Sequence, residues 1–259
     1  AVINQRQETP FRELETHLLP PPISVVLDEL KAEQNTNGIH TTADETAEAI
    51  ETWFKLVGAL LLAEYLNEGA PSGELNRWLF SLLSDKRPIL SGTWVAIGRA
   101  CHTELAKAWA AGSTPTWDAL RRVDLGSPDN PEHPVSKLVR YRNQFGHGAF
   151  AQVEAEIIEH GHLLEEQIGI LREDLANRPI RMINPDNSVV ILHGSEPGSY
   201  DQILFNSEAP RNIPVFTPFV EMPDGSIRQL APAVQLTKES DAHWSLGHAP
   251  LNDRKKPLD

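Results

Sequence analysis

The sequence predicts an α+β protein, with an N-terminal all-helical bundle followed by a small C-terminal antiparallel β domain. Apolar residues recur at three- and four-residue steps through most of the first 177 residues, as they do along helices packed in a bundle. After Arg178-Pro179 this period gives way to short apolar runs separated by Pro, Gly and Asp, the pattern of strands and turns. We therefore divide the chain into an N-terminal helical arm at residues 1–41, a helical bundle at 42–178, a β domain at 180–251 and a polar tail at 252–259.

The N-terminal arm is expected to contain two short helices. The first covers Phe11–Leu19 and ends at the breaker Pro20-Pro21-Pro22, and the second covers Ile23–Glu33. A polar loop at Asn35–Thr42 follows. We expect such an arm to pack on a neighbour, either in the same chain or in a second copy.

A long helix that begins near Thr42 is predicted to form the centre of the bundle. Asp44 and Glu45 lie in its first turn, where carboxylates favour the helix dipole. Its middle, WFKLVGALLLAEYL, is apolar almost all round. A helix without a polar face is buried on all sides, which places this one at the core.

Two further helices are predicted before the loops that precede residue 134. Ser72 opens a helix through Leu83, and Ser91 caps another from about Gly92 to Ala111, followed by a short helix around Trp117. Cys101 lies within the second of these. Because it is the single cysteine of the chain, we interpret it as a small buried hydrophobic residue and not as a reactive thiol.

The last bundle helix is predicted at Gln152–Ala176, where apolar residues keep a period near 3.5 and glutamates lie on the outer face. His160 and His162 lie beside Glu159, but they show no zinc-ligand spacing on one helix face. We expect a packed or exposed histidine pair and no metal site.

The β domain is predicted to be a small antiparallel sheet or a partly open barrel. The turn Pro223-Asp224-Gly225 lies between two apolar runs and indicates a β-hairpin. The predicted strands are Val189–Leu192, Gln202–Phe205, Val215–Glu221, Ile227–Leu230 and Val234–Leu236.

Composition limits the functions that fit. The net charge of −13 opposes a broad nucleic-acid-binding face, and so argues against DNA as a partner. The longest apolar run, Leu56–Ala63, is far shorter than the roughly 20 residues of a membrane span. One cysteine and no signal-peptide pattern lead us to expect a cytoplasmic protein. Phosphate-loop, dinucleotide-binding, serine-hydrolase and C-x-x-C motifs do not occur, so no cofactor is expected.

The segment PVSKLVRYRNQFGHGAF at residues 134–150 predicts an amphipathic helix in which one charge is out of place. Arg142 falls in the middle of the apolar arc of this helix, so it must be paired or lie in an interface. The arc is formed by Val135, Leu138, Val139 and Phe145.

A second face of the same helix carries Asn143 and His147, which are four residues apart and close to Arg140. Glycines on both sides of His147 predict a bent or terminating turn there. Lys137 and Arg140 make the helix locally basic.

The run Arg142-Asn143-Gln144-Phe145-Gly146-His147 resembles the R-polar-x3-H signature of the HEPN superfamily, small helical domains of which many are metal-independent ribonucleases. The resemblance covers this hexapeptide, and the helical pattern of residues 42–177 is compatible with the bundle of that family.

The resemblance implies a metal-free endoribonuclease, such as those of bacterial defence or toxin–antitoxin systems. His147 would move the proton of a ribose 2′-hydroxyl or of the leaving oxygen, and Arg142 would stabilise charge on the phosphate oxygens. Asn143 would orient the histidine or the phosphate, while Lys137 and Arg140 would contact RNA. In relatives two copies of the motif face each other, which implies a homodimer.

The alternative is a non-catalytic dimerisation or sensor module of a signalling or defence assembly. In that case Arg142 joins two helices through a buried carboxylate, and a protein partner binds through the β domain. The intact motif favours the ribonuclease, whereas the acidic surface and the appended β domain favour the module.

Overall fold

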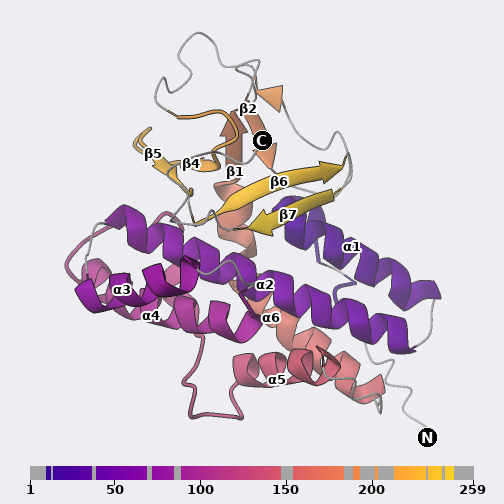
Figure 1. The fold of residues 1–259 in the computed structure, drawn as a ribbon. Helices are drawn as coiled ribbons and strands as arrows, with labels where there is room; N and C mark the ends of the chain where they lie inside the picture. Colours follow the sequence, from indigo (N-terminus) through magenta and orange to yellow (C-terminus); the bar gives the residue numbers. More distant parts are fainter. Residues whose placement is uncertain are drawn as a thin grey trace, which may run out of the picture.

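The computed structural model describes residues 10–12, 14–36, 39–68, 72–84, 89–146, 154–183, 189–192, 202–203, 213–231, 233–240 and 243–247. These residues form six α-helices, two short 3-10 helices and seven β-strands. Figure 1 shows the helices layered around α2, with the strands gathered above one side of them. The predicted α+β class is confirmed. The polar tail at 252–259 lies outside the described residues.

The N-terminal arm packs within its own chain. A 3-10 helix at Thr16–Leu18 precedes α1 (Pro21–Thr36), which lies against α2 (Ile39–Glu68). Pro21 and Pro22 begin α1, since the first turn of a helix needs no backbone N–H from its residues. The predicted loop at Asn35–Thr42 is wrong at both ends, because α1 continues to Thr36 and α2 already begins at Ile39. Packing of α1 on α2 stabilises these additional helical turns.

Helix α2 is the buried centre that its apolar sequence predicts. It contacts α1, α4, α5 and α6, and Leu56, Leu60 and Leu61 are fully buried. Gly58 lets α4 approach closely, because a Cβ at this position would lie 2.7 Å from the backbone oxygen of Trp94.

The remaining bundle helices are α3 (Gly73–Leu83), α4 (Ser91–Ala110), α5 (Pro134–Gly146) and α6 (Glu154–Asn177), with a 3-10 helix at Asp118–Arg122. Ser72 caps α3 as predicted, by accepting a hydrogen bond from the Leu75 backbone. The prediction that Ser91 caps α4 is wrong. Leu90 holds the cap position, and Ser91 is the first helical residue, fully buried with no hydrogen-bond partner for its hydroxyl among the described residues.

The strands form two antiparallel units. A five-stranded sheet has the order β3-β2-β1-β4-β5, and a separate hairpin pairs β6 with β7. The sequence did not predict β1 or β7. The bounds are β1 Ile180–Ile183, β2 Val189–Leu192, β3 Gln202–Ile203, β4 Phe219–Glu221, β5 Ile227–Gln229, β6 Gln235–Ser240 and β7 His243–Gly247.

The predicted hairpin at Pro223-Asp224-Gly225 joins β4 to β5. Met222 donates its backbone N–H to Ser226, and Gly225 has a φ of 78°, which suits glycine. Phe219 pairs with Gln229 and Glu221 with Ile227, so the turn sets the register.

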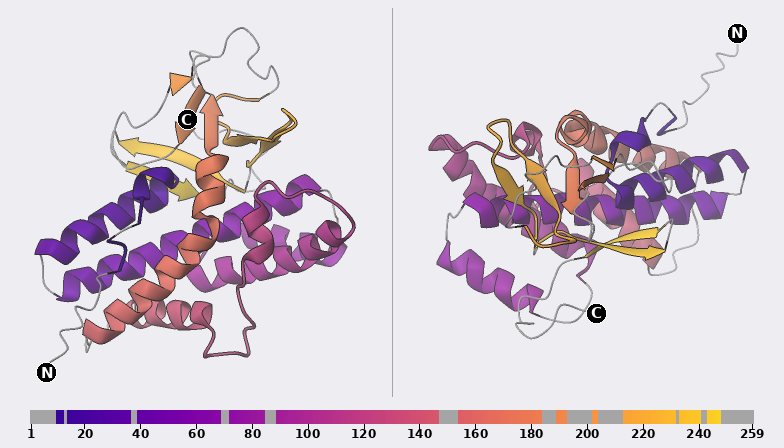
Figure 2. Two further views of the ribbon diagram at one scale, coloured as in Figure 1. Left: turned by 180° about the vertical axis from the view of Figure 1, so that it is seen from behind. Right: turned by 90° about the horizontal axis from the view of Figure 1, so that it is seen from above.

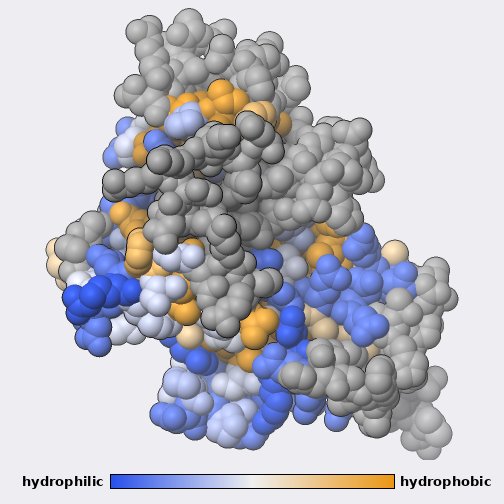
Figure 3. All heavy atoms as spheres, in the orientation of Figure 1, coloured by the Kyte–Doolittle hydropathy of each residue, from blue (hydrophilic) through white to orange (hydrophobic). Residues whose placement is uncertain are grey.

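Helix α6 crosses the back of the bundle and leads directly into β1, as the view from behind in Figure 2 shows. Apolar residues of the helices and of the sheet belong to one hydrophobic cluster, which includes Leu60, Leu175 and Val220. In Figure 3 the bottom of the molecule around α5 is mostly hydrophilic, whereas hydrophobic patches lie above it, several of them beside the grey atoms. The division into domains at Arg178-Pro179 stays a prediction, for which limited proteolysis is the test.

Candidate functional site

Helix α5 carries the motif, and its start follows from local chemistry. Pro134 is its first residue, and His133 Nδ1 accepts a hydrogen bond from the Val135 backbone at 3.3 Å. Val135 and Leu138 of the predicted apolar arc are buried and Val139 is half-buried, whereas the side chain of Phe145 lies outside what the structure describes. Tyr141, which the sequence did not assign to the arc, is buried as well. Arg142 follows Leu138 by one turn, so its side chain starts from this inward face.

Arg142 is paired within its own chain. Its Nε donates to Oε2 of Glu51 at 2.8 Å, and its Nη2 donates to the same oxygen. The prediction that this arginine needs a partner is therefore confirmed, and the partner is a carboxylate of α2. The arginine side chain is 23% exposed and the glutamate side chain 33%, so the pair lies at the edge of the core.

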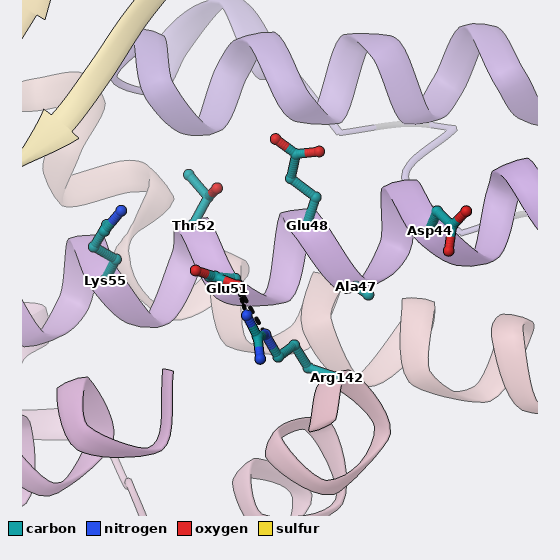
Figure 4. A pocket seen from close by; sticks show the side chains of 7 residues that line it. All are labelled: Asp44, Ala47, Glu48, Glu51, Thr52, Lys55 and Arg142. Carbon is teal, nitrogen blue, oxygen red and sulfur yellow. Dashed lines mark hydrogen bonds and ion pairs between the residues drawn. The ribbon is translucent and has the colours of Figure 1, made fainter. Parts of the chain in front are cut away.

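A pocket of about 440 Å³ lies beside this ion pair, between α2 and α5. Figure 4 shows that Arg142 reaches it from α5, while the other six lining residues lie on α2. Its charges are the carboxylates of Asp44, Glu48 and Glu51 against the cations Lys55 and Arg142. The carboxylates outnumber the cations, which disfavours an anionic guest.

Asn143 lines a different pocket. It lies with Arg140 in a pocket of about 620 Å³ between α4 and α5, as sequence reasoning placed these two residues on one face. Arg142 is absent from this lining, since neighbouring positions on a helix differ by about 100°. The structure therefore separates two of the three predicted catalytic residues.

Lys137, predicted to contact phosphate, lies in neither pocket lining. Its Nζ is 3.6 Å from a carboxylate oxygen of Glu132 and 4.0 Å from one of Glu159. Two acids thus compensate its charge. The predicted phosphate-binding pair Lys137 and Arg140 does not share either of these two pockets.

His147, the predicted acid–base group, lies outside the described residues. The histidines of α6 behave as packed or surface groups. His160 stacks on Tyr141 with ring centroids 4.3 Å apart, and His162 lies 3.5 Å from Glu165. Burial is the main reason why the pKa of Tyr141 is raised. Its hydroxyl therefore stays protonated near neutral pH.

Two residues near α5 were not recognised from the sequence. Glu51 is one of several acids on α2, and helical periodicity does not show which of them meets Arg142. Arg99 of α4 lines the pocket of Arg140 and Asn143, and its Nε donates to the backbone oxygen of Leu125 at 2.9 Å. The sequence pattern of α4 does not show that Arg99 meets the residues of α5, because this depends on how the two helices pack.

Within the described residues, no group of three His, Cys, Asp or Glu side chains could hold a metal ion. None of the described helices combines the length and apolar character needed to cross a bilayer. Comparisons of the chain with models of protein families, with curated proteins and with solved structures give no match. Function is therefore inferred from the geometry of the site and from the sequence motif.

Proposed function

We propose that this chain is a non-catalytic, HEPN-like helical module that binds a protein partner in a signalling or defence assembly. One observation carries the proposal: the motif arginine, Arg142, is held by Glu51 of its own chain. In this arrangement the arginine joins α5 to α2, which is the structural role that a buried or half-buried ion pair performs.

The surroundings of Arg142 support the same conclusion. A phosphate entering the pocket between α2 and α5 would meet Asp44 and Glu48 and would compete with Glu51 for the guanidinium. Asn143, which would have to act on the same phosphate or histidine, lines the other pocket. Catalysis needs its groups aimed at one reacting atom, and these two are aimed apart.

A surface beside the sheet is suited to a protein partner. Val215 and Phe216, shortly before β4, are 42% and 57% exposed. The backbone of Phe216 also has a φ of 63°, which residues other than glycine rarely adopt. Such backbone conformations cluster at functional sites. Exposed aromatic residues are typical of the centres of protein interfaces.

The second candidate is the metal-independent ribonuclease. It is favoured by the position of Arg142, which lines a pocket open to solvent and keeps Nη1 without a hydrogen-bond partner among the described residues. In this mechanism Arg142 exchanges Glu51 for the scissile phosphate, and His147 transfers the proton of the 2′-hydroxyl or of the leaving oxygen.

Homodimerisation remains part of both proposals through the family resemblance. Since Glu51 already pairs with Arg142 in the same chain, the arginine does not itself require a second copy. Light scattering over a wide concentration range tests this point, and a mass that stays at that of one chain would remove the dimer.

One experiment separates the two candidates. The wild type, His147→Ala and the matched control His162→Ala, which alters a partly exposed histidine of α6, are each incubated with a mixed RNA pool and a chelator. The module proposal predicts the same background cleavage from all three proteins.

The opposite result is cleavage by wild type and His162→Ala that leaves cyclic phosphate ends and disappears in His147→Ala. That outcome would overturn the module proposal and establish the ribonuclease. Melting curves of the same variants show whether any lost activity reflects lost folding.

A further inference from the structure

The pocket between α4 and α5 is lined by positive charges, although the protein as a whole is acidic. Arg99 of α4 and Arg140 of α5 both line it, and none of its lining residues is an aspartate or a glutamate. The chain as a whole has a net charge of −13. A cavity that gathers cations on an acidic protein concentrates positive potential at one place.

Within the part of the chain that the structure describes, neither arginine has an ion-pair partner. Among the described residues no carboxylate oxygen lies within ion-pair distance of Arg99 or Arg140, whereas Arg142, Arg178 and Arg228 each have such a partner. Arg99 donates its Nε to a backbone oxygen, which leaves its two Nη groups for another acceptor. Partial burial lowers the pKa of Arg99, with the more distant Asp124 opposing this shift. A desolvated cation without a counter-charge gains most from an anion.

The start of α4 lies at the same cavity. Gly92 is the second residue of this 20-residue helix and lines the pocket. The N–H groups of Thr93 and Trp94 bond to Leu90, whereas that of Gly92 has no partner among the described residues. Free N–H groups and the helix dipole at such a terminus favour an anion.

The other residues that line the pocket indicate an anion that has both polar and apolar parts. Ser136, Asn143 and Gln144 offer neutral hydrogen-bonding groups, while Val95 and Val139 form an apolar wall. The volume of about 620 Å³ lies in the range of small-molecule sites. We propose that the cavity between α4 and α5 binds a small organic anion, in which a phosphate or carboxylate group meets Arg99 and Arg140 and an apolar body lies on the valines.

This inference stands apart from the proposed function. It needs neither His147 nor the pair of Arg142 with Glu51, and it assigns Asn143 to ligand binding without catalysis. An anion bound here would join α4 to α5 and would favour whichever conformation of the bundle holds the two helices together.

The test uses the full chain and three probes of similar size: phenyl phosphate, benzoate and the neutral benzyl alcohol. Titration calorimetry should show saturable binding of phenyl phosphate, of benzoate or of both, and none of benzyl alcohol. The anion that binds more tightly identifies the head group. Binding should weaken as salt rises, because an exposed ion pair is screened.

Arg140→Met removes one cation and should weaken binding of the better anion about tenfold or more. Arg140 is exposed, so this variant should fold as the wild type does. The matched control is Arg77→Met, which removes an exposed arginine of α3 away from the pocket and should leave the affinity unchanged. Arg140→Lys keeps the charge without the planar fork and should give an intermediate affinity.

Three results would overturn the inference. They are no saturable binding of either anion to the wild type, equal affinities of wild type and Arg140→Met, and benzyl alcohol binding as tightly as the anions. Tight binding of a single-stranded RNA oligonucleotide that depends on Arg140, without binding of the small anions, would likewise replace the small-molecule site with a nucleic-acid contact.

Discussion

Arg228 and Glu64 are 164 residues apart in the sequence, yet the Nη1 of the arginine donates to Oε1 of the glutamate at 2.8 Å. This pair ties β5 to the middle of the bundle. Glu64 is 1% exposed and also accepts hydrogen bonds from the backbone N–H and the hydroxyl of Thr116. Arg228 lies 3.2 Å from Glu68 as well, so one arginine serves two carboxylates of α2.

Glu64→Gln is expected to change how stability depends on pH. Burial raises the pKa of Glu64 in the folded state, against the opposing effects of Thr116 and Arg228. The stability that this carboxyl contributes is therefore present below its unfolded pKa and is lost as pH rises through the folded pKa. Glutamine keeps the acceptor oxygen without the titration.

The free energy of unfolding of Glu64→Gln minus that of wild type should thus increase from about pH 4 to about pH 8. Urea unfolding across this range measures the difference. Glu173→Gln, at an exposed position of α6, is the control for removal of a surface carboxylate. A difference for Glu64→Gln that decreases with pH would contradict the assigned direction.

The ion pair of Arg142 and Glu51 should appear as a coupling energy in a double-mutant cycle. Because both side chains are partly exposed, we expect about 1 kcal/mol between Arg142→Met and Glu51→Gln. The matched cycle of Lys137→Met and Glu132→Gln tests a longer contact with a largely exposed acid, and it should give a smaller coupling. Additive effects of the Arg142 and Glu51 changes would show that the pair does not join α5 to α2.

Gly58→Ala and Gly169→Ala should change stability in opposite directions although both lie inside helices. A Cβ at residue 58 meets the backbone of Trp94, so we expect a loss of about 1 to 3 kcal/mol. A Cβ at residue 169 meets nothing within 4 Å, and alanine should add about 0.5 to 1 kcal/mol there. Urea denaturation measures the change in stability of each variant. Equal changes in stability would refute the close approach of α2 and α4.

The Cys101 thiol should not react with alkylating reagents in the folded protein. It is a free thiol with no exposed surface, as the sequence predicted, and burial raises its pKa to about 12. Only the thiolate reacts with alkylating reagents, so iodoacetamide at about pH 8 should label the unfolded chain and leave the native protein unlabelled. Rapid labelling without denaturant would contradict this burial.

Most of the helical architecture was predictable because it depends on local pattern. The apolar surface of α2 requires a central position, the stripe of α5 defines its buried face, and Asp224-Gly225 specifies a tight turn between β4 and β5. Strand β1 was missed because Ile180–Ile183 is a short run that begins only two residues after α6, and it becomes a strand by pairing with β2 and β4.

The sequence by itself determined that Arg142 needs a partner, since a charge on an apolar helix face cannot stay unpaired. Only the tertiary structure decided that the partner is Glu51, 91 residues earlier, and that Asn143 and Arg99 line another pocket. The physical reason is that periodicity specifies which face of a helix is buried, whereas the neighbour that covers this face follows from the packing of the whole chain.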